Sequence, residues 1–174
     1  MRRSLILSLL ATAAVLLPSF VASAATASDP NDTPGRLDLS SITTTRLPRG
    51  VTRIVLVTYG GWSDATLGQG TGNELIVRMD LDGNGTMDCR AVVSTNGTNN
   101  LHAETIGKPC ADGPFPVGHP NPTTAVIRLP AHSPGNPDQI WHAAGASRFT
   151  GPAACAMVCI DRAPDTGWLL IPAP

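Results

Sequence analysis

The chain has 174 residues, with 12 Lys and Arg against 13 Asp and Glu, so its net charge of −1 at pH 7 offers no basic footprint for a nucleic acid or an anionic membrane. It is rich in Gly, Pro, Thr and Val and poor in Lys and Glu, which disfavours long exposed helices. A chain of this length suits one domain with a core of ordinary size.

The first 24 residues have the features of a cleaved signal peptide. Arg2 and Arg3 precede an apolar run over residues 5–17, and Ala22-Ser23-Ala24 is a small-x-small cleavage site. The run is shorter than the about 20 residues that a membrane span needs, so we expect removal of this segment. A cut after Ala27 is also compatible with the sequence.

Removal of the signal peptide sets where the mature protein is expected to begin. We predict a signal peptide over residues 1–24, a polar and flexible lead-in over residues 25–35, and a single domain over residues 36–174. The protein is then secreted (extracellular), with no membrane span after signal removal. Its net charge becomes about −3 because two arginines leave with the signal peptide.

Short runs of apolar and β-branched residues predict an all-β fold. The run over residues 51–59 is β-branched on both faces, which is typical of a central strand. Five prolines between residues 107 and 122 exclude a regular helix or an interior strand there. The pattern predicts an antiparallel β-sandwich, immunoglobulin-like or jelly-roll, with strands over residues 36–47, 51–59, 73–79, 89–94, 100–106, 123–129, 139–146, 157–161 and 167–171.

Residues 80–88, Asp-Leu-Asp-Gly-Asn-Gly-Thr-Met-Asp, have the spacing of a calcium-binding loop. Side-chain oxygens recur at the first, third, fifth and ninth positions, and a glycine at the sixth allows the sharp turn. We therefore predict Ca²⁺ as the cofactor, bound by the side chains of Asp80, Asp82, Asn84 and Asp88 and by the backbone carbonyl of Thr86.

The flanks of the 80–88 loop decide which kind of calcium loop it is. An EF-hand needs an acidic ligand at the twelfth position, and that position is Ala91. Because predicted strands flank the loop, it resembles the Asp-x-Asp-x-Asn-Gly-x-x-Asp calcium hairpins of integrin-type propellers and bacterial exported proteins. The alternative is a plain hairpin turn, which Asp82-Gly83 and Asn84-Gly85 would also favour. A plain turn does not require the two flanking aspartates.

Four cysteines in an exported chain favour disulfides. Three pairings are possible, and distance along the sequence favours Cys155 with Cys159 and Cys89 with Cys110. A zinc site is disfavoured because there is no Cys-x-x-Cys and no histidine cluster. A bond from Cys89 would brace the C-terminal end of the 80–88 loop.

Two connections, over residues 60–72 and 107–122, are longer than simple turns and are candidate binding loops. The first contains Trp62 and Asp64, which we predict to form a partly exposed platform for a sugar ring. The alternative is that Trp62 packs inward over the sheet end. Trp141 lies in a predicted strand and is expected in the core.

No sequence motif indicates catalysis. There is no Gly-x-Ser-x-Gly, no His-Glu-x-x-His and no phosphate-binding glycine loop. The histidines have no metal-binding spacing and lie on separate elements, at His102, His119, His132 and His142. A catalytic triad can assemble from distant residues, which leaves an extracellular hydrolase as an alternative.

The stretch over residues 154–165, Ala-Cys-Ala-Met-Val-Cys-Ile-Asp-Arg-Ala-Pro-Asp, together with Gly35-Arg36-Leu37-Asp38 and Asp80-Leu81-Asp82-Gly83, resembles a set of uncharacterised secreted actinobacterial β-sandwich proteins. The resemblance implies export and an all-β domain, and it transfers no active-site residue. We expect an exported, non-catalytic, calcium-stabilised binding or surface-interaction module with an extracellular glycan or protein as partner. The alternatives are a glycan-binding module that uses Trp62 and an extracellular hydrolase.

Overall fold

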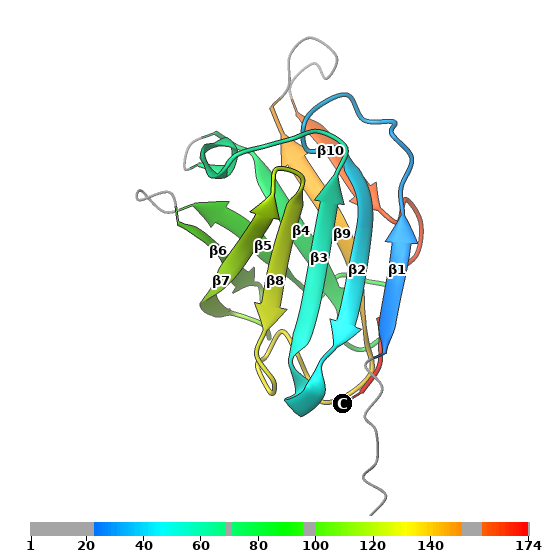
Figure 1. Ribbon diagram of the computed structural model, residues 1–174. Helices are drawn as coiled ribbons and strands as arrows, with labels where there is room; N and C mark the ends of the chain where they lie inside the picture. Colours follow the sequence, from blue (N-terminus) through cyan, green and yellow to red (C-terminus); the bar gives the residue numbers. More distant parts are fainter. Residues whose placement is uncertain (1–22, 69–70, 96–99, 151–157, 174) are drawn as a thin grey trace, which may run out of the picture.

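The computed structural model describes residues 23–68, 71–95, 100–150 and 158–173, which form an antiparallel β-sandwich (Figure 1). This confirms the predicted all-β class. No helix in the described part of the chain is long and apolar enough to cross a membrane. The strands are β1 (Ala24–Ser28), β2 (Leu39–Arg46), β3 (Thr52–Thr58), β4 (Glu74–Asp80), β5 (Cys89–Thr95), β6 (Leu101–Ile106), β7 (Asp112–Asn121), β8 (Thr124–Leu129), β9 (Trp141–Phe149), β10 (Cys159–Ala163) and β11 (Leu169–Ile171), with two short 3₁₀ helices, η1 (Pro48–Gly50) and η2 (Asp64–Leu67).

The strands form one hydrogen-bonded path that folds over into two layers. Its order is β1-β2-β3-β8-β7-β6-β5-β4-β9-β10, and β11 pairs with β9. The layer β1-β2-β3-β8 lies in front of the layer β5-β4-β9-β10 (Figure 1). At the two ends of the path, β10 packs on β2 and β11 packs on β1, so the ends meet along a seam.

The core lies between the layers because alternate residues of each strand point inward. Every second residue of β3 is buried, and β3 pairs with β2 on one side and β8 on the other, which confirms that it is central. Trp141 is fully buried, as predicted. At Gly145 in β9 a Cβ would lie 3.0 Å from Leu56 Cδ2, so the glycine allows the backbone of one layer to approach side chains of the other.

The prediction that prolines exclude an interior strand from residues 107–122 is wrong. β7 carries Pro114, Pro116 and Pro120 and still joins the two layers by pairing with β6 through its first half and with β8 through its second. Pro114 and Pro120 lie within the irregular stretches of the two ladders, and each half of β7 pairs with one neighbour only, so few ladder donors are missing. Both ladders contain register shifts, which lowers the number of backbone donors that β7 has to provide.

The expected flexible lead-in over residues 25–35 differs from the structure in its first four residues. Ala24–Ser28 forms β1, which pairs with β2 from Ala24↔Thr45 to Ser28↔Ser41. Its residues are alanines, a threonine and a serine, so it lacks the large apolar side chains that mark a strand in the sequence. A cut after Ala24 would leave four of the five β1 residues in place, while most of the predicted signal peptide, residues 1–22, lies outside the described residues.

A buried polar cluster closes one end of the sandwich. Asn136 is 0% exposed, and its Nδ2 donates to the carbonyls of Gly50, Leu129 and Pro130 at 2.8 to 3.2 Å. Its Oδ1 accepts hydrogen bonds from Thr52 and from the Arg46 guanidinium. One asparagine therefore ties the turn after β2 to the segment after β8.

Candidate functional site

The 80–88 loop connects β4 to β5 and is folded around the carboxylate of Asp80. This side chain is 0% exposed. Its Oδ1 accepts a hydrogen bond from the Gly83 amide at 2.8 Å, and its Oδ2 accepts one from the Gly85 amide at 2.9 Å. Both glycines have positive φ angles, 73° and 85°, which most other residues would adopt only with strain. The sequence therefore directs the two amides onto the first carboxylate of the loop.

Two further carboxylates of the loop converge on Asp80. One oxygen of each of Asp80, Asp82 and Asp88 lies within 4.8 Å of the others. Two oxygens on opposite sides of a Ca²⁺ ion at bonding distance are separated by about 5 Å, so this spacing fits a shared ion. The Leu81 amide donates to Asp88 Oδ2 at 2.7 Å, which fixes the last carboxylate against the first turn of the loop.

Asn84 and Thr86, the other predicted ligands, lie in the same loop. The Asn84 side-chain oxygen accepts a hydrogen bond from the Thr86 amide at 2.7 Å, and its Nδ2 donates to Asp82 Oδ2 at 2.8 Å. These bonds use one lone pair of each acceptor and leave a second one free. A calcium role for either residue therefore remains a prediction.

Two residues far away in the sequence support the loop, and no motif predicted them. His142, from the adjacent strand β9, places its Nδ1 3.4 Å from Asp80 Oδ2, and Gln139 donates to the Leu81 carbonyl at 2.8 Å. Burial of Asp80 opposes ionisation, but the hydrogen bonds from the Gly85 and Gly83 amides, with the nearby His142 imidazole, outweigh this effect and hold the pKa of Asp80 below its usual value. The loop is thus built to keep this carboxylate charged.

The disulfide Cys89–Cys110 is present, as predicted, with its Cα atoms 6.0 Å apart. Cys89 begins β5 directly after Asp88, so the bond fixes the end of the loop to the segment between β6 and β7. Cys159 is also disulfide-bonded, and its expected partner, Cys155, lies outside the described residues.

The prediction that Trp62 is partly exposed is wrong. Its exposed fraction is 4%, and it belongs to the core cluster. The imidazole of His119, from β7, stacks on the indole with ring centroids 3.9 Å apart and an angle of 5° between the planes. The Trp62 amide also donates to the Pro122 carbonyl at 2.8 Å. One ring face that a sugar would need is therefore covered by a neighbouring side chain.

Asp64 holds the covering histidine in place. His119 Nδ1 lies 2.7 Å from Asp64 Oδ1, and both residues line a hollow of about 590 Å³ together with Trp62. An Asp-His pair is two thirds of a hydrolytic triad. However, His119 Nε2 is buried with no hydrogen-bond partner among the described residues, so no described hydroxyl or thiol makes the contact that an activated nucleophile requires.

A second hollow, of about 410 Å³, lies on the outer face of the rear layer, and sequence patterns gave no sign of it. Each of four adjacent strands contributes one arginine to its lining: Arg78 from β4, Arg90 from β5, Arg148 from β9 and Arg162 from β10. The guanidinium carbons of Arg78 and Arg162 lie 5.6 and 5.1 Å from the centre of the Trp168 ring. Glu74 and Asp161 also line the hollow, so four arginines outnumber two carboxylates here although the chain is acidic.

Comparison with known proteins gave no match to any protein-family model, curated protein or solved structure.

Proposed function

We propose that this protein is an exported, non-catalytic β-sandwich domain that binds one Ca²⁺ in the 80–88 loop and acts as a binding module. The observation that carries the proposal is the convergence of Asp80, Asp82 and Asp88 to within 4.8 Å in a loop whose amides already fold onto Asp80. A plain turn needs no buried carboxylate at its first position and gains nothing from three like charges held together.

Export is supported by the disulfide and by the N-terminal sequence. Disulfides persist in oxidising compartments outside the cytosol, and Cys89–Cys110 is fully buried at both cysteines. Millimolar calcium is also typical of the extracellular space, where loops of modest affinity are filled.

The calcium proposal is tested by isothermal titration of the chelator-treated full chain with CaCl₂. Asp82→Ala should remove one bound ion, because it deletes one of the carboxylate ligands. The loop should keep its fold in this variant, since Asp82 is exposed and the two amide bonds to Asp80 remain. Asp112→Asn is the matched control, since this exposed aspartate lies on β7, outside the loop. Equal calcium binding by wild type and Asp82→Ala would exclude the 80–88 loop as a calcium site.

For the surface of the module, the arginine-lined hollow favours an anionic partner such as a sulfated polysaccharide. Burial and, secondarily, the charge of Arg78 lower the pKa of Arg162, so a bound anion would relieve repulsion between these two guanidinium groups. Arginine also matches sulfate and carboxylate groups through paired hydrogen bonds. The exposed Ile160, 71% accessible, supplies an apolar contact beside the charges.

Retention on dextran sulfate, compared with neutral dextran, tests this surface. Wild type should be retained by the sulfated polymer at low salt and released as salt screens the charges. Arg78→Gln and Arg148→Gln should each weaken retention, whereas Arg53→Gln, on β3 of the front layer, should not. Equal loss in all three variants would indicate a general charge effect and would contradict a specific surface.

A further inference from the structure

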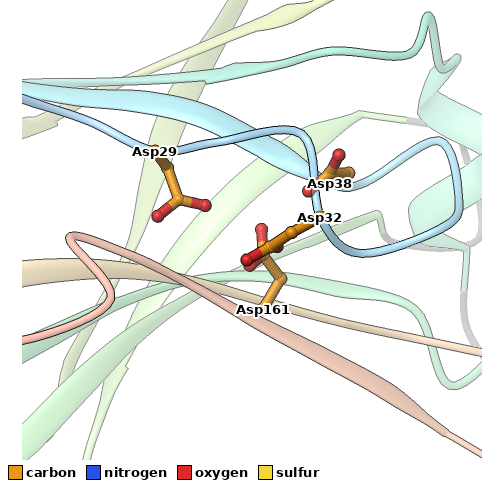
Figure 2. Close-up of side chains that lie close together, drawn as sticks. All are labelled: Asp29, Asp32, Asp38 and Asp161. Carbon is orange, nitrogen blue, oxygen red and sulfur yellow. The ribbon is translucent and has the colours of Figure 1, made fainter.

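A second group of acidic side chains gathers at the seam of the sandwich, far from the 80–88 loop in sequence. Asp29 directly follows β1, Asp32 lies in the β1–β2 connection, Asp38 directly precedes β2, and Asp161 lies in β10. Figure 2 shows their carboxylates converging from these separate segments. One oxygen of each lies within 4.8 Å of the others.

Two members of the group are buried without a cationic partner, or a hydrogen bond of normal geometry, among the described residues. Asp29 is 3% exposed and Asp38 is 1% exposed, and all four of their carboxylate oxygens lack a hydrogen bond within the described part of the chain. Buried carboxylates are otherwise almost always hydrogen-bonded, paired with a cation side chain or bound to a metal. Asp29 and Asp38 each turn at least one of these oxygens toward the other carboxylates of the group (Figure 2).

The remaining members show how the group is held in place. The backbone amide of Leu39 donates to Asp161 Oδ2 at 2.6 Å, and the amide of Arg162 donates to Asp161 Oδ1 at 2.8 Å. Asp32 is exposed, so the group is open to solvent on that side. Within the described ranges, no Lys, Arg or His side chain forms an ion pair with any of the four aspartates.

We propose that Asp29, Asp32, Asp38 and Asp161 hold a second calcium ion, independent of the 80–88 loop. The donor set consists of carboxylate oxygens only, which suits a hard divalent cation. Calcium accepts six to eight oxygens in irregular geometry, so the four carboxylates supply most of its shell and water enters on the exposed Asp32 side. A small Mg²⁺ ion demands near-octahedral geometry and keeps several waters, which suits four carboxylates with two buried members less well.

The electrostatics of the group support this assignment. Burial, together with the charge of Asp161, raises the pKa of Asp29 to about 7 and that of Asp38 to about 6. The carboxylates therefore repel one another when ionised near neutral pH. A divalent cation at their centre removes that repulsion without requiring a proton.

A calcium ion in this group would lie at the seam between β10 and β2. The two ends of the strand path meet where β10 packs on β2, and no strand pairing joins them. An ion shared by the β1–β2 connection and β10 would fasten this seam. It would also order residues 29–38, which link the first two strands.

Calcium titration of the chelator-treated full chain separates the two sites. The Asp82→Ala protein, in which the 80–88 loop is impaired, should still bind one calcium ion. Adding Asp38→Asn, which keeps the shape of the side chain but removes its charge, should weaken that binding about tenfold or more. Asp165→Asn is the matched control, because this exposed carboxylate lies near Asp29 but outside the group, and it should change the affinity less than about twofold.

Hydrogen exchange gives a second readout. Calcium should slow amide exchange over residues 29–38 in the Asp82→Ala protein and should have no such effect once Asp38→Asn is added. If that double variant does not fold, Asp32→Asn replaces Asp38→Asn, since Asp32 is exposed.

The outcomes distinguish this site from the proposed calcium loop. If the wild type binds one ion, and this binding is insensitive to Asp82→Ala but lost in Asp38→Asn, the result would support this site and would exclude the 80–88 loop as a calcium site. Binding of one ion that Asp82→Ala abolishes, or equal calcium affinity in the Asp82→Ala protein with and without Asp38→Asn, would overturn the second site.

Discussion

Replacement of Trp62 by alanine tests whether this residue belongs to the core, as the structure places it, or forms a binding surface. The indole is 4% exposed and stacks on His119 at 3.9 Å. Loss of a buried Trp typically costs about 3–5 kcal/mol of unfolding free energy, because apolar contacts disappear and a cavity remains. For a domain of this size the melting temperature should fall by roughly 6–20 °C.

The assay is urea denaturation followed by circular dichroism at saturating calcium. Trp168→Ala serves as the control, since Trp168 is half-buried and contacts the guanidinium groups of Arg78 and Arg162, and it should cost only about 1 kcal/mol. A double-mutant cycle with His119→Ala should give a coupling of about 0.5–1.5 kcal/mol from the stacked rings. A cost below about 1 kcal/mol for Trp62→Ala would refute the core placement.

Three further predictions concern stability. Replacing Cys89 and Cys110 by serine, which opens a link across 21 positions, should cost about 3 kcal/mol and should weaken calcium binding through a looser loop end, as calorimetry and titration would show. Asn136→Ala should lower the free energy of unfolding in urea by about 2–4 kcal/mol, because buried donors and acceptors lose their partners. A loss near zero would contradict a stabilising role for the Asn136 cluster. In chelator, the free energy of unfolding should fall as the pH rises from about 4 to 7. The raised pKa values of Asp29 (about 7) and Asp38 (about 6) mean that the folded protein keeps protons which the unfolded chain has released, so stability rising over this window would contradict them.

The strand pattern and the 80–88 loop were accessible from the sequence because both depend on local order. Alternating burial in strands such as β3 produces a period of two in the sequence, and the three converging carboxylates of the loop lie within nine residues. The disulfide Cys89–Cys110 followed from distance along the chain. In these cases sequence neighbours are also spatial neighbours.

Features formed by segments that are distant along the chain could not be predicted from the sequence. β7 is rich in proline and pairs with a different strand in each half, which only the complete sheet reveals. The burial of Trp62 depends on His119, which is held by Asp64 from 55 positions away. The acidic group at the seam joins β10 to the β1–β2 connection, and Asp161 accepts a hydrogen bond from the Leu39 amide, 122 positions earlier, with no common motif.

The melting temperature of the chelator-treated wild-type protein, with and without calcium at equal ionic strength, tests the central claim most directly. With a Kd of ~10 μM, ~1 mM calcium would add about 2.7 kcal/mol to the free energy of unfolding for each site. The account therefore predicts a rise of roughly 5 °C or more, which EGTA reverses. A melting temperature that calcium leaves unchanged would contradict the claim that this sandwich is a calcium-stabilised domain.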